Sequence, residues 1–154
     1  MNYQVAQINI AKMLAPLDSP IMANFVANLD VINSLAESSK GFVWRLKDDH
    51  NNATSIKIYN DEFLLVNMSV WNDVESLFQF AYHSQHVEIF KMRKEWFAQM
   101  APMHMALWFV PEGHQPLVEE ATKRLDYLRT HGETPYAFNF KKRFSIDDAI
   151  NYKL

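Results

Sequence analysis

The chain contains no cysteine among its 154 residues and only three glycines. Without cysteine it can form no disulfide, no thiolate metal site and no cysteine nucleophile. The three glycines are far apart, so there is no glycine-rich loop of the kind that holds phosphates or dinucleotides. The Gly-x-Ser-x-Gly sequence of serine hydrolases is also absent. The sequence therefore lacks the signatures of common nucleotide-binding and hydrolytic enzymes.

Neither a strong charge nor a long apolar run marks the chain. The 15 lysines and arginines against 18 acidic residues give a formal net charge of −3, so no overall positive field attracts nucleic acid. No window approaches the roughly 18 uninterrupted apolar residues of a membrane span. The first residues lack the basic and apolar regions of a signal peptide. We therefore expect neither a nucleic-acid nor a membrane partner, and a cytoplasmic location.

Apolar residues are abundant enough to form a packed core. They make up 49% of the chain, and aromatic residues make up 14%. There is no internal repeat, linker or low-complexity segment, and single domains are commonly about 100–150 residues long. Residues 1–154 are therefore expected to form one domain.

Hydrophobic periodicity predicts an alternation of strands and helices. The tail from residue 136 alternates at Phe138 and Phe140, which predicts an edge strand or a contact with a partner chain. A helix break near residues 83–85 is left open. Strands are predicted at residues 3–13, 41–46, 63–71 and 105–110, and helices at residues 20–36, 74–82, 87–100 and 116–130.

This order, β-α-β-β-α-β followed by an extra C-terminal helix, is typical of the ferredoxin-like α+β fold. In that fold a four-stranded antiparallel sheet carries helices on one face. Alternate positions on both faces of the predicted sheet are largely apolar, so neither face is expected to be fully solvated. The simplest cover for the second face is another copy of the chain, sheet against sheet. The pattern therefore predicts a homodimer.

Several short segments between residues 7 and 140 resemble the DUF3291 family. The resemblance implies a branch of the dimeric α/β-barrel superfamily, which includes antibiotic-biosynthesis monooxygenases, small cyclases and stress-responsive proteins. It supports the fold and the dimer, whereas the chemistry stays open because the family name denotes unknown function. The segments are Asn9-Ile10-Ala11, Ala15-Pro16-Leu17-Asp18, Gly41-Phe42-Val43-Trp44-Arg45-Leu46, Asn67-Met68-Ser69-Val70-Trp71, Arg93-Lys94-Glu95-Trp96-Phe97 and Leu107-Trp108-Phe109-Val110-Pro111-Glu112-Gly113-His114.

Polar side chains interrupt the two strands that this fold places at the centre of the sheet. Gln7 and Asn9 of the first strand are expected beside Asn67 and Ser69 of the third. Such groups cost roughly 1–3 kcal/mol each when they are buried without partners. They either bond to one another or to buried water, or they line a pocket for a carbonyl or phenolic ligand. Asn33, polar within an apolar helix stripe, either faces the same space or bonds to nearby backbone.

The segment around His86 supplies the candidate for acid–base chemistry. If the helix continues through it, Tyr82 and His86 share one face with Phe78 and Phe90. His86 is then predicted to be a general base near neutral pH, with Tyr82 as its hydrogen-bonding neighbour. His83 points roughly 100° away from Tyr82 and is the weaker candidate. The alternative is a histidine at a helix break that bonds to backbone.

Metal binding has little support in the sequence. His83 and His86 are spaced to share a metal ion, but a site needs at least one further ligand. Nothing in the spacing ties His104 or His114 to this pair. We therefore predict no metal and no cofactor. The alternative is a haem held through a single histidine, for which there is no attachment motif.

Four tryptophans and one arginine complete the candidate residues. Trp71 and Trp96, with Trp44 and Trp108, can wall a flat aromatic ligand or pack in the core and at a dimer interface. Arg45 lies among apolar neighbours on a strand. If it is buried, it needs a carboxylate partner or an anionic ligand.

The first functional hypothesis is a cofactor-independent monooxygenase, or a cyclase or isomerase, that acts on an apolar carbonyl or phenolic compound. Asn9 and Asn67 would then stabilise a developing enolate or oxyanion. The alternatives are a non-catalytic carrier or sensor of a small molecule or haem, and a stress-response dimer without a pocket. The predicted catalytic residues are His86 and Tyr82, and the predicted substrate-binding residues are Asn9, Asn33, Arg45, Asn67, Ser69, Trp71 and Trp96.

Overall fold

The structure, a computed structural model, describes residues 2–99 and 103–154. Strands and helices follow one another in the predicted order. Local signals explain several of the boundaries: Asp73, for example, starts the second long helix by accepting a hydrogen bond from the backbone N–H of Ser76 at 2.7 Å. The elements are β1 (Tyr3–Lys12), η1 (Pro20–Met22), α1 (Ala23–Glu37), β2 (Phe42–Arg45), β3 (Leu64–Trp71), α2 (Val74–His83), α3 (His86–Phe90), α4 (Arg93–Trp96), β4 (Met105–Pro111), α5 (Val118–His131) and α6 (Ile146–Asn151).

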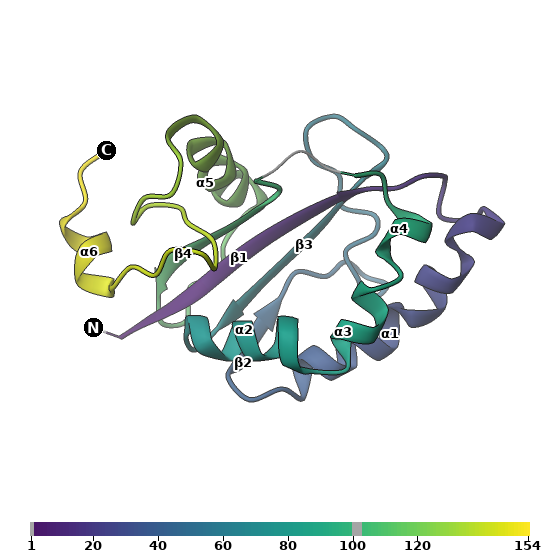
Figure 1. Ribbon diagram of the computed structural model, residues 1–154, viewed down its shortest axis with the longest axis horizontal. Helices are drawn as coiled ribbons and strands as arrows, with labels where there is room; N and C mark the ends of the chain where they lie inside the picture. Colours follow the sequence, from purple (N-terminus) through teal and green to yellow (C-terminus); the bar gives the residue numbers. More distant parts are fainter. Residues whose placement is uncertain (1, 100–102) are drawn as a thin grey trace.

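The four strands form one antiparallel sheet in the order β2-β3-β1-β4 (Figure 1). The sequence prediction of an α+β fold with a four-stranded antiparallel sheet is therefore confirmed. The register places Gln7 of β1 opposite Ser69 of β3 and opposite Leu107 of β4. It also pairs Asn9 with Asn67. The predicted polar row thus exists at the centre of the sheet.

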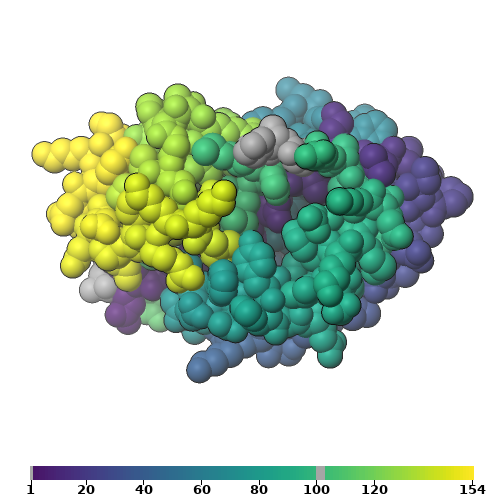
Figure 2. All heavy atoms as spheres, viewed as in Figure 1, coloured from purple at the N-terminus to yellow at the C-terminus, as the bar shows by residue number. Residues whose placement is uncertain are grey.

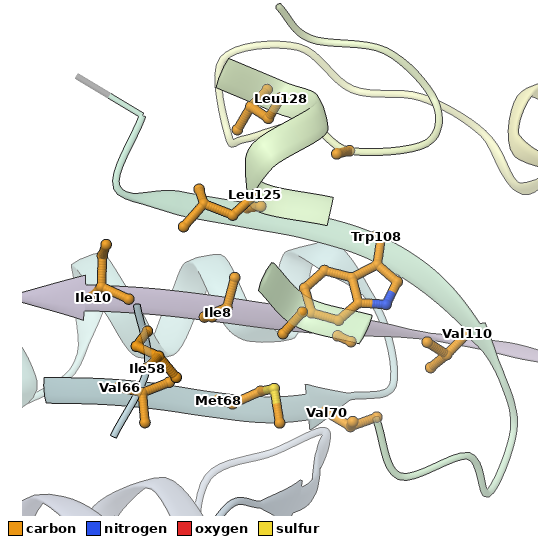
Figure 3. Packing of buried hydrophobic residues seen from close by; sticks show 14 of the residues in the cluster. Ile8, Ile10, Ile58, Val66, Met68, Val70, Trp108, Val110, Leu125 and Leu128 are labelled. Atoms are coloured by element: carbon orange, nitrogen blue, oxygen red, sulfur yellow. The ribbon is translucent and has the colours of Figure 1, made fainter. Parts of the chain in front are cut away.

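One face of the sheet, which we call the core face, carries mostly apolar side chains and packs under α5 (Figure 3). The loop between β2 and β3 contributes Ile58 to this layer, and the C-terminal tail contributes Ala137. Every residue of the cluster is at most 8% exposed. The cluster consists of Ala6, Ile8, Ile10, Ile58, Leu64, Val66, Met68, Val70, Ala106, Trp108, Val110, Ala121, Leu125, Leu128 and Ala137.

This burial removes the reason that led to the predicted sheet-on-sheet dimer. The apolar second face does not need a second copy, because the chain covers it with its own helix, loop and tail. The sequence pattern showed that the face is apolar, but it did not show which segment covers it. The homodimer itself stays a prediction.

The opposite face, which we call the polar face, carries Gln7, Asn9, Asn67 and Ser69 and lies toward α1 to α4 (Figure 1). Apolar clusters pack at both ends of the polar row. At one end, Trp71 and Leu107 pack with Leu77 of α2 and Phe138 of the tail. Phe138 also pairs with Leu107 through an isolated β-bridge, so the tail adds an edge contact to β4. At the other end a second cluster holds Met13, Met22, Leu65 and Trp96.

The helical region after β3 is broken at the position that the sequence left open. The backbone of Ser84 is extended, and its hydroxyl donates to the carbonyl of Phe80 at 2.5 Å and accepts from the N–H of His86 at 3.1 Å. These bonds end α2 and start α3, so Tyr82 and His86 do not share a helix face. The helix predicted at residues 87–100 is also divided, into α3 and α4, and its predicted end at residue 100 lies outside the described residues. No helix in the described ranges is both long and apolar enough to cross a membrane.

Candidate functional site

A cavity of about 950 Å³ separates the polar face of the sheet from helices α1 to α4. Figure 2 shows the hollow between the helical segment drawn in teal and the C-terminal segment drawn in yellow, with atoms of the purple N-terminal region at its bottom. Volumes of roughly 300–1,000 Å³ are typical of small-molecule sites. All seven predicted substrate-binding residues and His86 line this cavity.

Part of the polar row is already hydrogen-bonded. The side-chain nitrogen of Gln7 donates to Oδ1 of Asn67 at 2.5 Å and to Oγ of Ser69 at 2.9 Å. The same Ser69 oxygen accepts the indole N–H of Trp71 at 2.8 Å. These bonds hold the side chains of the cavity floor in fixed orientations.

Other amides at the cavity have no such partner. Within the described residues, no hydrogen bond is made by the side chain of Asn9 on the sheet or of Asn33 on α1. Asn67 uses only its oxygen toward Gln7, and its side chain is exposed to the cavity. Three of the four residues in the polar row are therefore paired with one another, whereas Asn9 and the amide nitrogen of Asn67 are available to a ligand.

The apolar stripe of α1 lines the cavity along its middle, and it packs on the buried clusters only near its two ends, through Phe25 and Ala36. Phe25, Leu29 and Ile32 follow one another at the spacing of an amphipathic helix and belong to the cavity lining. No residue of this 15-residue helix is buried. An apolar helix face that looks onto a polar sheet face across an open space makes a site for an amphipathic molecule.

Arg45 lies at the β2 edge of the polar face, directly opposite Ser69 in the register. It is 7% exposed, so it is buried. A buried arginine needs a carboxylate partner or an anionic ligand. Its Nη2 donates to Oδ1 of Asn51 at 2.9 Å and lies 3.5 Å from Oε1 of Glu37. The Glu37 side chain is 43% exposed, so the pair is partly solvated and weak.

His86 starts α3 and faces the cavity between two aromatic rings. Its ring lies 5.0 Å from the ring of Phe80 and 6.0 Å from that of Phe90, centroid to centroid. Nδ1 lies 3.2 Å from the carbonyl oxygen of Ala81, which can only accept, so Nδ1 carries the proton and Nε2 keeps its lone pair. Burial lowers the pKa of His86, and the bond to Ala81 opposes this only in part. His86 is therefore neutral at pH 7 and fit to accept a proton.

Tyr82 does not stand beside His86 as the sequence predicted. Its side chain is 48% exposed and is absent from the described lining of the cavity. The ring packs instead on Phe78 and on Phe140 of the tail. The helix break at Ser84 separates the two residues that an unbroken helix would have stacked.

The sequence did not predict the partner that His86 has in place of Tyr82. Phe80 stacks on Trp71 at 5.2 Å and contacts the tilted ring of His86 at 5.0 Å, so it connects the histidine with the tryptophan that bonds to Ser69. Asn52 and Thr54 of the loop after β2 also line the cavity and were not predicted. Their polar, loop-like sequence carried no signal for this position. Among the described residues there is no group of three or more side chains suited to hold a metal ion.

The lowered pKa of His86 predicts a pH dependence of stability. The unfolded chain takes up the histidine proton at a higher pH than the folded chain, so the free energy of unfolding falls as the pH falls below about 6.5, until the folded pKa is passed. In His86→Gln this loss is absent. The free energies of unfolding of the two proteins are measured with denaturant at a series of pH values. Their difference should be constant above about pH 7, and below it the variant should gain stability relative to the original chain.

The matched control for this titration is His83→Gln, because His83 is exposed and ends the neighbouring helix. A stability difference for His86→Gln that does not change with pH would contradict a buried, neutral His86.

Comparison with protein families places the whole folded region in one family. The match is to the model described as a domain of unknown function, DUF3291, and it covers residues 4–153. No curated protein and no solved structure matches the chain. The match includes every residue that lines the cavity described above. The chain belongs to the DUF3291 family.

Proposed function

We propose that this protein binds a small, largely apolar organic molecule in the cavity between the polar face and α1 to α4. The observation that carries the proposal is the unburied apolar stripe of α1, which faces hydrogen-bonding groups of the sheet across about 950 Å³. A helix stripe of this kind normally packs against a core. Here Phe25, Leu29 and Ile32 offer an apolar wall to a guest, and Asn9 and Asn67 offer amides to its oxygen atoms.

The chemistry that these residues support best is proton transfer by His86. Its Nε2 would accept a proton from a carbon next to a carbonyl group, or from a phenol, and the electron pair left behind would move onto oxygen. The amide N–H groups of Asn9 and Asn67 would stabilise that oxyanion. In a cyclase or isomerase His86 returns the proton to another atom, whereas in a monooxygenase the carbanion reacts with O₂ as co-reactant. No step needs Tyr82.

A non-catalytic carrier or sensor is the second candidate, and one observation favours it. His86 is oriented by a backbone carbonyl, and the described residues offer it no carboxylate partner of the kind that supports many catalytic histidines. The same cavity would then hold its ligand unchanged.

We also propose that the chain is one ferredoxin-like domain of the dimeric α/β-barrel superfamily. The strand order β2-β3-β1-β4, with antiparallel neighbours throughout, supports the ferredoxin-like part. The homodimer rests on the family resemblance alone. Its contact must lie outside the core face, because that face is buried within one chain.

Native mass spectrometry of the freshly purified protein, with an absorption spectrum, tests the bound molecule and the dimer together. We expect a small organic compound that leaves on denaturation, no visible absorption band, and an assembly of about twice the 18.0 kDa chain mass. Asn33→Trp, which fills the cavity from α1, should lose the compound and should not bind added Nile red. Ser34→Trp is the matched control, because Ser34 is the exposed neighbour outside the lining.

Three outcomes would count against these proposals. If both tryptophan variants retain the compound and bind Nile red equally, or if neither the original chain nor the control binds anything, the cavity is not the binding site. A haem band would contradict the cofactor-free proposal. A mass of one chain at all concentrations would contradict the homodimer and leave the binding proposal intact.

A further inference from the structure

Arg45 is a buried cation whose hydrogen-bonding capacity is only partly used. Its side chain is 8% exposed, yet both of its bonds to protein come from Nη2. Nε is inaccessible to water and has no hydrogen-bond partner, and no described residue bonds to Nη1. Buried donors without partners are costly, most of all on a charged group. The structure thus leaves a guanidinium at the cavity that protein atoms do not satisfy.

The charged side chains that line the cavity have one sign, whereas Glu37, the acidic partner of Arg45, lies outside the described lining. None of the described residues that line it is an aspartate or a glutamate, although the chain has 18 acidic residues and a net charge of −3. The lining includes three cationic side chains: Arg45 in the buried part, and Arg93 and Lys94, which are exposed. Cations at an opening attract anions, and a buried cation binds them once they are desolvated.

Neutral hydrogen-bonding groups lie beside Arg45 in the sheet. The register places Arg45, Ser69 and Gln7 side by side across three strands, with Asn67 and Asn9 in the neighbouring pair. One guanidinium among neutral amides and a hydroxyl can neutralise a ligand group that carries a single negative charge. A doubly charged phosphate would leave its second charge without a buried partner.

We infer that the molecule bound in the cavity is a carboxylic acid, whose carboxylate is held by Arg45 and whose apolar body lies along α1. A carboxylate accepts two parallel bonds from one guanidinium, which no other side chain donates in the same way. This inference rests on the proposed function, because it names the ligand class of the same cavity. His86 is connected to Ser69, the register partner of Arg45, only through Phe80 and Trp71, so we assign it to the apolar body of the ligand.

The test compares the binding of pyrenebutanoate with that of its neutral methyl ester, followed by pyrene fluorescence. The original chain should bind the carboxylate roughly 10- to 150-fold more tightly, which is the range that a charge-assisted hydrogen bond provides. Arg45→Met should lose this preference and keep the affinity for the ester. Arg45→Lys should restore only part of it, because a lysine keeps the charge without the planar donor pair. Lys47→Met, at an exposed position outside the lining, should change nothing.

Each result separates this inference from the proposed function. Equal affinities for acid and ester in the original chain would overturn the carboxylate assignment while leaving a binding cavity. Failure of both probes to bind would overturn the proposed function as well. If a pyrenyl phosphate monoester binds more tightly than pyrenebutanoate, the ligand class is a phosphate and the carboxylate assignment is overturned. If Arg45→Met does not fold, as judged by its circular dichroism, Arg45→Lys and the pair of probes still decide the question.

Discussion

Replacing Trp108 by alanine is expected to lower the free energy of unfolding by about 3–5 kcal/mol, the usual range for a large aromatic residue in a core. Trp108 of β4 is fully buried on the core face, between the strands and α5 (Figure 3). Its indole N–H also donates to Oε2 of Glu120 on α5 at 2.9 Å. The substitution therefore removes both packing and a bond between the sheet and the helix. A domain is commonly stable by about 5–15 kcal/mol, so this loss is a large share of the total.

The informative control is Leu29→Ala on α1, because its side chain faces the cavity rather than the core. Removing atoms that border an existing space breaks few contacts, so we expect a loss below about 1 kcal/mol. Trp108→Phe separates the contribution of the indole N–H from that of packing. Chemical denaturation measures all three variants. A loss for Leu29→Ala as large as that for Trp108→Ala would mean that α1 packs on a core and that the cavity does not exist.

The strands and most helices were predictable because their signals are local. The first strand alternates apolar and polar residues, and Asp73 with Ser76 supplies the capping pair of α2. The antiparallel pairing of β1 with β3 followed from element order, and it brought Asn9 opposite Asn67 as expected. Order alone is sufficient here, because few topologies join such elements without crossing connections.

Contacts between distant parts of the chain were not predictable in the same way. Periodicity identified the apolar stripe of α1 but not what it faces, since a core and a ligand cavity require the same residues. In the same way, an apolar core face is compatible with a second copy or with cover by the chain itself. Ala137 lies far from the strands in sequence and Ile58 lies in the loop before β3, and nothing local marks either residue as that cover.

The helix break explains why Tyr82 lies outside the cavity; two further candidates, Trp44 and Trp108, lie outside it because they belong to the core face. Serine next to a helix end can bond to backbone as well as to solvent, so Ser84 permits either an unbroken helix or a break. In the structure it bonds to Phe80 and His86 and ends α2. Phe80, rather than Tyr82, becomes the aromatic neighbour of His86. His86 lines the cavity, although the shared helix face on which its prediction was based does not form, and its role as a base stays a prediction.

The turn before β2 leads to the last prediction, which concerns Gly41. Its φ angle is +87°, in the region that favours glycine, and an added Cβ would overlap the side chain of Ser76 in the first turn of α2. We expect Gly41→Ala to lower the free energy of unfolding by about 2–5 kcal/mol. Backbone strain accounts for roughly 1–2 kcal/mol of this and steric overlap for about 1–3 kcal/mol. Denaturant unfolding measures the loss.

Two further variants separate these contributions. Gly113 has the same φ of +87° but no atom within 4 Å of an added Cβ, so Gly113→Ala should show the strain alone. When Gly41→Ala is made in a Ser76→Gly background, its cost should fall to about that of Gly113→Ala, because the overlap is removed. An unchanged cost in that background would contradict the steric explanation.

Gly41 also precedes the strand that carries Arg45, and its carbonyl accepts the N–H of Asn72 at 2.7 Å. A displaced β2 would move the guanidinium, so Gly41→Ala should weaken the preference for pyrenebutanoate over its ester, whereas Gly113→Ala should leave that preference unchanged.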